Sequence, residues 1–278
     1  MAGTRALVLG SGGVTGVAWQ IGVLCGLARA GVDLGDADLV VGTSAGAVVG
    51  AQLRSGADLA RLYAGQLVPG EPSADRMGPG AVSRVLLAAV GSRDGRRARA
   101  RIGRYAVAAA AGSRVSRRPV FEEALPVWSW PQRPLWVTGV DADSGDFVVF
   151  DASSGVDLVD AVSASCAVPG VWPPVVIGAR RFVDGGMRSA ANVDLAVGYA
   201  AVVVLAPIGW GVGHLPSVSR QAVALGSGVV VVSPDRAARR VIGRRLLDPA
   251  RRVGAARAGR RQGLSVAGRV GRLWGGVG

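Results

Sequence analysis

A serine set among small residues and an aspartate followed by two glycines lie 140 residues apart in this chain of 278 residues. The two segments are Gly42-Thr43-Ser44-Ala45-Gly46 and Asp184-Gly185-Gly186. A Gly-x-Ser-x-Gly segment is typical of a nucleophile elbow, in which the serine sits on a sharp turn from strand to helix. Asp184 offers a carboxylate on an equally tight turn. The pair predicts nucleophilic chemistry in which Ser44 attacks a substrate and Asp184 accepts its proton.

Histidine, the usual proton acceptor for a serine nucleophile, occurs once in the chain, at His214. It lies in a loop-like segment, residues 211–216, in which nothing beside it resembles a site. The sequence therefore favours direct activation of Ser44 by Asp184. A solvated aspartate has a pKa of about 3.9 and is a weak base near neutrality, so this role requires a partly buried carboxylate. The alternatives are an ordinary turn aspartate and an ordinary capping serine.

A glycine-rich loop near the N-terminus, residues 10–16, reads Gly-Ser-Gly-Gly-Val-Thr-Gly. As a dinucleotide-binding fingerprint it fails by one position, because the third glycine would fall at Thr15. As an oxyanion hole it needs only unhindered amides at a helix N-terminus, which Gly12, Gly13 and Val14 supply. The oxyanion hole fits a serine nucleophile, and a dinucleotide-dependent enzyme is the competing interpretation.

Hydrophobic patterning predicts an α/β fold with a mostly parallel central sheet flanked by helices. Short apolar runs predict buried strands at residues 6–9, 39–41, 135–140, 147–150, 175–177, 181–183, 201–205 and 229–232. A helix is expected after the glycine-rich loop, with Val17, Ile21, Leu24 and Ala28 on one face, and another begins at residues 45–51. This order of strand, turn and helix is typical of a parallel sheet covered by helices.

We expect one domain over residues 1–278, with its core at about residues 5–206. Helical segments broken by prolines predict a cap over the site at about residues 54–134, and an arginine-rich helical region occupies about residues 234–278. Asp157 is expected to cap a helix through Ala164, and Pro249 to begin another. The glycine-rich tail after Gly263 is expected to be loose.

The formal net charge of +13 comes entirely from arginine, because the chain has no lysine. The arginines gather in two clusters, at residues 93–104 and 236–261. Neither cluster is interleaved with aromatic residues for base stacking, so nucleic acid is not a predicted partner. The alternatives are a solvated helix face and attraction to acidic lipid headgroups, which would also suit a non-catalytic membrane-binding protein.

Cys25 and Cys166 are the only cysteines, which leaves neither a disulfide framework nor a metal motif, and buried, reduced thiols are expected. A Ser-Asp site needs no metal and no cofactor. The N-terminus lacks the charged and apolar regions of a secretory signal, and no apolar run reaches the ~18 residues of a membrane span. The sequence therefore predicts a cytoplasmic protein, and peripheral membrane contact through the arginine clusters stays open as an alternative to a solvated surface.

The three motifs in this order resemble those of the patatin-like phospholipase family. That family has a glycine-rich oxyanion loop, a Gly-x-Ser-x-Gly nucleophile some thirty residues later, and Asp-Gly-Gly or Asp-Gly-Ala well downstream. The likeness covers roughly residues 5–206, including the small-residue run at 164–174 and the segment at 192–196. It implies a three-layer α/β/α fold, a Ser-Asp dyad and hydrolysis of a phospholipid, lysophospholipid or other fatty-acyl ester. A transacylase with the same dyad is the alternative.

Two residues of the glycine-rich loop depart from the family pattern. Ser11 stands where the family usually has the first of three glycines, and Thr15 stands where it has arginine or lysine. These departures bear on how the loop is held and on headgroup preference. The assignments of Ser44 and Asp184 do not depend on them.

Overall fold

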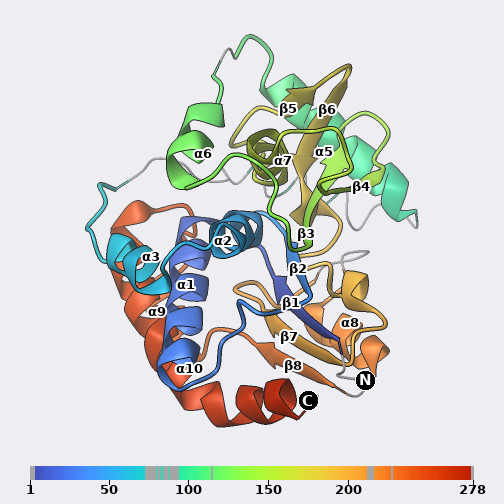
Figure 1. Ribbon diagram of the computed structural model, residues 1–278. Coiled ribbons are helices and arrows are strands. Elements are labelled where there is room, and N and C mark those ends of the chain that lie inside the picture. Colours follow the sequence, from blue (N-terminus) through green and yellow to red (C-terminus); the bar gives the residue numbers. More distant parts are fainter. Residues whose placement is uncertain are drawn as a thin grey trace.

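The computed structural model describes residues 4–72, 80, 83, 87, 94–113, 115–211, 216–226 and 228–276. Its eight-stranded sheet has the order β5-β6-β3-β2-β1-β7-β8, with β4 paired to β3 (Figure 1). The strands are β1 Arg5–Leu9, β2 Leu39–Gly42, β3 Leu135–Asp141, β4 Phe147–Phe150, β5 Val175–Ile177, β6 Arg180–Asp184, β7 Ala201–Leu205 and β8 Val229–Val232. The pairs among β1, β2, β3, β7 and β8 are parallel, and those made by β4, β5 and β6 are antiparallel.

Helices cover both faces of this sheet, which gives three layers (Figure 1). One face packs against α1, α2, α7 and α10, and the other packs against η2 and α8. The helices are α1 Gly13–Arg29, α2 Ala45–Arg54, α3 Leu59–Gln66, α5 Gly95–Ala109, α6 Arg118–Ala124, α7 Leu158–Ser165, η1 Gly185–Met187, η2 Val193–Ala196, α8 Val218–Leu225, α9 Arg236–Ile242, η3 Pro249–Arg251 and α10 Arg252–Gly275. The α/β fold with a mostly parallel sheet that the sequence predicts is confirmed.

The strands that lead to the two motifs end at the same edge of β3. Strand β2 runs parallel to β3, with Gly42 opposite Val137, whereas β6 runs antiparallel to it, with Asp184 opposite Gly139. Strand β4 pairs with residues 137–140 of β3 and so takes the other edge. The strands β2 and β6 therefore run toward each other, and their carboxyl ends meet beside Thr138. This register brings the serine turn to the aspartate turn.

The C-terminal helix α10 overturns the expectation of a loose tail after Gly263. It continues to Gly275, lies along α1, and buries Trp274 near its end. Glycines let the two backbones touch, since a Cβ added at Gly26 would lie 2.3 Å from the Arg260 carbonyl oxygen, and one at Gly263 would lie 2.3 Å from that of Val23. Glycine lowers helix propensity, so the composition suggested a loose chain, but here the missing side chains permit close packing.

Two smaller expectations also need correction. Asp157 stands at the N-cap of α7, which ends at Ser165, but its side chain makes no capping hydrogen bond and instead pairs with Arg118 at 3.6 Å. Helix α1 packs against both the sheet and α10, so its burial follows no single stripe, and Ala28 is exposed. Pro249 begins a short helix, as expected.

Gly263→Ala is expected to lower the free energy of unfolding by about 1–3 kcal/mol, because its new methyl group meets the Val23 backbone. Gly268 is exposed on the same helix and provides the matched control. Gly268→Ala should raise the free energy of unfolding by up to about 1 kcal/mol through helix propensity. Urea unfolding followed by circular dichroism measures both changes. Equal effects of the two substitutions would contradict the close packing of α1 and α10.

Candidate active site

Ser44 occupies the sharp turn between β2 and α2. Its backbone has φ 55° and ψ −117°, a conformation that L-residues rarely adopt and that is strained by about 1–3 kcal/mol. The turn brings α2 so close to β1 that a Cβ at Gly46 would lie 1.9 Å from the Leu9 carbonyl oxygen. The Ser44 N–H donates to Ser165 Oγ at 2.9 Å. Glycine at position 46 and this hydrogen bond together fix the turn, which has the form of the predicted elbow.

Asp184 ends β6 and is almost fully buried, with 3% of its surface exposed. Its Oδ1 accepts a hydrogen bond from the Gly186 N–H at 2.7 Å, and the Ser44 hydroxyl lies close enough to its carboxylate to lower the carboxylate's pKa. Burial raises the pKa of Asp184 to about 6, although the hydrogen bonds from Ser44 and Gly186 act in the opposite direction. The structure thus brings together the two side chains that the sequence singled out.

Cys166 is a third side chain at this point. It follows α7 and is buried close to the Ser44 hydroxyl. Burial and the nearby Asp184 carboxylate raise the pKa of its thiol, so the sulfur carries no charge at neutral pH. Cys166 therefore contributes a neutral, weakly polar wall beside Ser44.

The glycine-rich loop presents free amides at the start of α1. Among the described residues, the N–H groups of Gly12, Gly13 and Val14 have no hydrogen-bond partner. This first turn lies beside the start of α2, since a Cβ added at Gly16 would lie 3.5 Å from that of Ala45. Two helix N-termini, whose dipoles favour negative charge, are therefore neighbours at the serine turn.

Thr15, at the position of the family's cation, fastens this loop to the C-terminal part of the chain. Its side chain is buried, and both its N–H and its hydroxyl donate to the Leu246 carbonyl oxygen, at 3.0 and 3.2 Å. A backbone carbonyl between α9 and η3 thus holds the loop. This contact could not be predicted, because its partners are separated by 231 residues.

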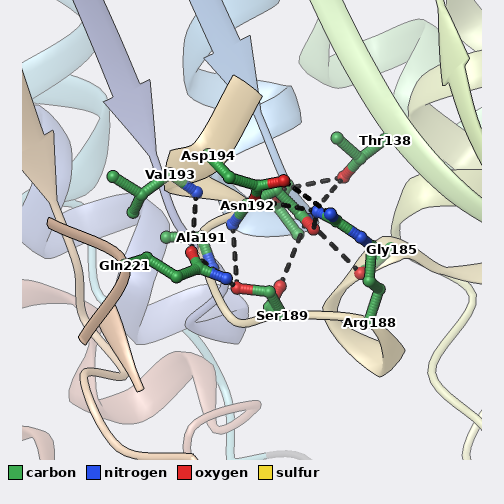
Figure 2. Close-up of polar contacts among 10 residues, drawn as sticks. Thr138, Gly185, Arg188, Ser189, Ala191, Asn192, Val193, Asp194 and Gln221 are labelled. Carbon is green, nitrogen blue, oxygen red and sulfur yellow. Dashed lines mark hydrogen bonds and ion pairs between the residues drawn. The ribbon is translucent and has the colours of Figure 1, made fainter. Parts of the chain in front are cut away.

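A buried amide joins the serine turn to the aspartate turn, and sequence reasoning did not identify this role (Figure 2). Asn192 Nδ2 donates to Thr43 Oγ1 at 3.0 Å and reaches the Gly185 carbonyl oxygen at 3.5 Å. Thr138 Oγ1 lies in the gap between the two strand ends and donates to Thr43 Oγ1 at 2.9 Å. A Cβ at Gly185 would lie 2.3 Å from Thr138 Oγ1, so glycine is required there.

A second set of contacts holds Asn192 itself in a left-handed conformation with φ 50°. Arg188 Nη1 donates to Asn192 Oδ1 at 2.8 Å, and Arg188 also pairs with Asp194 (Figure 2). The Asn192 N–H donates to Ser189 Oγ at 3.0 Å, and that hydroxyl in turn donates to Gln221 Oε1 at 3.2 Å. The family-like run at residues 192–196 marked this segment, but its partners are distant in sequence and could not be read from it.

His214 lies outside the described residues. Within the part of the chain that the structure describes, no group of three or more histidine, cysteine, aspartate or glutamate side chains could hold a metal ion. The described helices also include none with the length and apolar character needed to cross a membrane.

A serine on a strained turn, a buried carboxylate beside it and free amides at a helix N-terminus form an arrangement typical of serine hydrolases. The family model described as patatin-like phospholipase matches residues 7–197, and the chain belongs to this family. The chain is accordingly a lipid acyl hydrolase, an enzyme that acts on carboxylic ester bonds.

Solved structures with a similar chain course include VipD from Legionella pneumophila, with 11% identity and a TM-score of 0.49 over 97% of this chain. The type III effector protein ExoU is 18% identical, with a TM-score of 0.42 over 98% of this chain. The complex of SpcU with ExoU from the type III secretion system of Pseudomonas aeruginosa gives 19% identity and a TM-score of 0.38 over 94% of this chain. The matches cover 67% of the VipD chain and 54% and 53% of the other two chains.

The variants Asn192→Ala and Asn192→Gly both remove the side-chain amide, but only glycine adopts the left-handed backbone conformation of residue 192 without strain. Comparing them distinguishes the effect of the hydrogen bonds from the effect of the backbone conformation. Both variants lose the link between Thr43 and Gly185, and both should react with a fluorophosphonate about 10²-fold more slowly, because the two turns lose their mutual alignment. Alanine also strains the left-handed backbone, so only Asn192→Ala should lose a further ~1 kcal/mol or more in urea unfolding. Labelling of Asn192→Gly at the wild-type rate would show that the amide does not position the site.

Proposed function

We propose that Ser44 and Asp184 form a catalytic dyad that hydrolyses fatty-acyl esters. The ionised Asp184 carboxylate accepts the Ser44 proton while Ser44 Oγ attacks the ester carbonyl carbon. The resulting oxyanion accepts hydrogen bonds from the N–H groups of Gly12, Gly13 and Val14. Asp184 then returns the proton to the departing alcohol, which leaves an acyl group on Ser44.

Water completes the cycle by the same route. Asp184 takes a proton from the water as its oxygen attacks the acyl carbon, and the fatty acid leaves as the proton returns to Ser44 Oγ. No step calls for a metal or a nucleotide. The observation that carries this proposal is the position of the Ser44 hydroxyl beside a buried carboxylate whose pKa burial raises to about 6. Such a carboxylate is ionised at neutral pH and yet is a stronger base than a solvated aspartate.

We expect the substrate to be a phospholipid, a lysophospholipid or a related fatty-acyl ester, as the family implies.

We also propose that residues 1–278 form one domain, in which about residues 54–134 form a cap over the site. Helix α5 packs closely on the strands of the site, since a Cβ at Gly103 would lie 1.9 Å from the Ala142 carbonyl oxygen. Helix α6 packs against α7, which leads to Ser165 and Cys166.

Ser44→Ala and Asp184→Asn are expected to abolish fluorophosphonate labelling and to lower the hydrolysis of a chromogenic acyl ester by at least about 10³-fold. The first variant lacks the nucleophile, and the second retains the shape of the carboxylate but cannot accept the proton as strongly. Matched controls are Ser153→Ala, in an exposed turn, and Asp33→Asn, exposed at the opposite end of β2. Unchanged turnover in Ser44→Ala would refute the assignment, and product analysis with an added alcohol separates hydrolysis from acyl transfer.

The pH dependence of kcat/KM gives an independent check on Asp184. Its carboxylate must be ionised to accept a proton, so activity should be full above the raised pKa of about 6 and should fall tenfold per pH unit below it. A flat profile between pH 5 and 8, or an acid limb near the ordinary aspartate pKa of about 4, would contradict the role of a buried base.

We propose that the C-terminal arginine cluster touches an acidic lipid surface. Arg244 and Arg245 are exposed and directly precede Leu246, whose carbonyl holds the glycine-rich loop. Positive charge therefore adjoins the proposed oxyanion donors. The arginines of α5 lie apart from α9 and α10, beside β3 and β4 (Figure 1), and Arg96 there is paired with Asp146.

Arg244→Gln combined with Arg245→Gln should weaken binding to vesicles that contain phosphatidylserine by about tenfold or more at low salt, given about 1 kcal/mol for each arginine. Cosedimentation with vesicles measures the effect. The matched control combines Arg96→Gln with Arg97→Gln on α5 and should bind nearly as well as the wild type. A loss confined to the α5 variant would place the contact on the other cluster.

A further inference from the structure

Ser11 carries a buried hydroxyl that the proposed mechanism does not use. The residue is 8% exposed, and its N–H donates to the Ala190 carbonyl oxygen at 2.7 Å. Its Oγ is inaccessible to solvent and has no hydrogen-bond partner among the described residues. A buried hydroxyl without a partner is costly, and most such groups in proteins are paired. Where the family has glycine, this chain keeps a polar group at that cost.

The surroundings of this hydroxyl show where a partner lies. A Cβ added at Gly186 would lie 2.7 Å from Ser11 Oγ and 2.8 Å from Asp184 Oδ1, so both oxygens lie against the same face of Gly186. Because Gly186 has no side chain, nothing from that residue separates them. Rotation about the Ser11 Cα–Cβ bond is the movement that would bring the hydroxyl to the Asp184 carboxylate.

We propose that Ser11 is a positioning residue whose hydroxyl donates a hydrogen bond to the ionised Asp184 carboxylate during the reaction. This inference rests on the proposed Ser-Asp dyad. The carboxylate can accept about four hydrogen bonds, and it receives one from the Gly186 N–H and one from the Ser44 hydroxyl. When Ser44 carries an acyl group, its hydroxyl proton is gone. Ser11 supplies a further donor to the ionised carboxylate of the free enzyme, and the same donor is available later, when Asp184 must take a proton from water.

The other titratable groups around Asp184 are accounted for. The Ser44 hydroxyl faces it from the start of α2, and the Cys166 thiol faces it from the end of α7 with a raised pKa that keeps the thiol neutral. Among the described residues Asp184 has no ion-pair partner. Its ionised form therefore depends on neutral donors, so one added or removed hydroxyl should have a measurable effect.

The test compares Ser11→Ala and Ser11→Gly with the wild type in the rate of fluorophosphonate labelling as a function of pH. Loss of a donor to the charged form should move the midpoint of the acid limb upward by about one pH unit in both variants. The labelling rate on the alkaline plateau should stay within about threefold of the wild type. Ser163→Ala is the matched control, because it removes a buried hydroxyl in α7 that bonds the Val159 carbonyl instead. It should leave the acid limb in place.

The outcomes separate this inference from the proposed function. Labelling of Asp184→Asn at the wild-type rate would refute the proposed Ser44-Asp184 dyad. Loss of labelling in Asp184→Asn, together with an unmoved acid limb in Ser11→Ala and Ser11→Gly, would overturn the role of Ser11 alone. If Ser11→Ala fails to fold, Ser11→Gly decides the question, because glycine is the family's usual residue there and adds no atoms. An equal upward shift in Ser163→Ala would mean that the acid limb reports general destabilisation and would also overturn the proposal.

Discussion

Everything at the candidate active site depends on two strands that end against each other on one edge of β3. Strand β2 arrives in parallel and β6 arrives antiparallel, and the side chain of Thr138 lies in the gap between their ends. Each strand then turns sharply, one into α2 and the other into η1. The backbone geometry of a mixed sheet thereby brings a hydroxyl and a carboxylate together from opposite directions. If β6 ran parallel to β2, the two strands would lie side by side, and Asp184 and Ser44 would follow the ends of neighbouring strands without meeting end to end.

The candidate active site contains strained backbone conformations and a buried carboxylate, and stabilising contacts elsewhere in the fold must offset their cost. Ser44 and Asn192 both adopt positive φ values, and Asp184 is buried without an ion-pair partner among the described residues. Such features persist only where surrounding contacts over-determine them. Here the Asn192 amide donates to Thr43, the residue before Ser44, and the Ser165 hydroxyl accepts a hydrogen bond from the Ser44 N–H. The raised pKa of Asp184 and the alignment of Ser44 are thus products of the same packing.

Much of the fold could be predicted from the sequence because its strands are short apolar runs with clear turn residues at their ends. The two motif residues, Ser44 and Asp184, could also be found, because glycines beside them mark tight turns. The links between the turns could not, since Thr138 and Asn192 are ordinary polar residues whose partners lie far along the chain. The part of helix α10 that follows Gly263 was missed for a related reason. Its glycines reduce helix propensity locally, and their value appears only when α1 lies against them.

The hydrogen bonds between Thr15 and the Leu246 carbonyl oxygen limit how far this enzyme can be truncated. The family match ends at residue 197, and the three motifs end before it. The carbonyl that steadies the glycine-rich loop and the helix that covers α1 both come later in the chain. A fragment trimmed to the matched region would keep the residues of all three motifs and still lose the contacts that hold the glycine-rich loop. The smallest working unit is therefore larger than the smallest recognisable one.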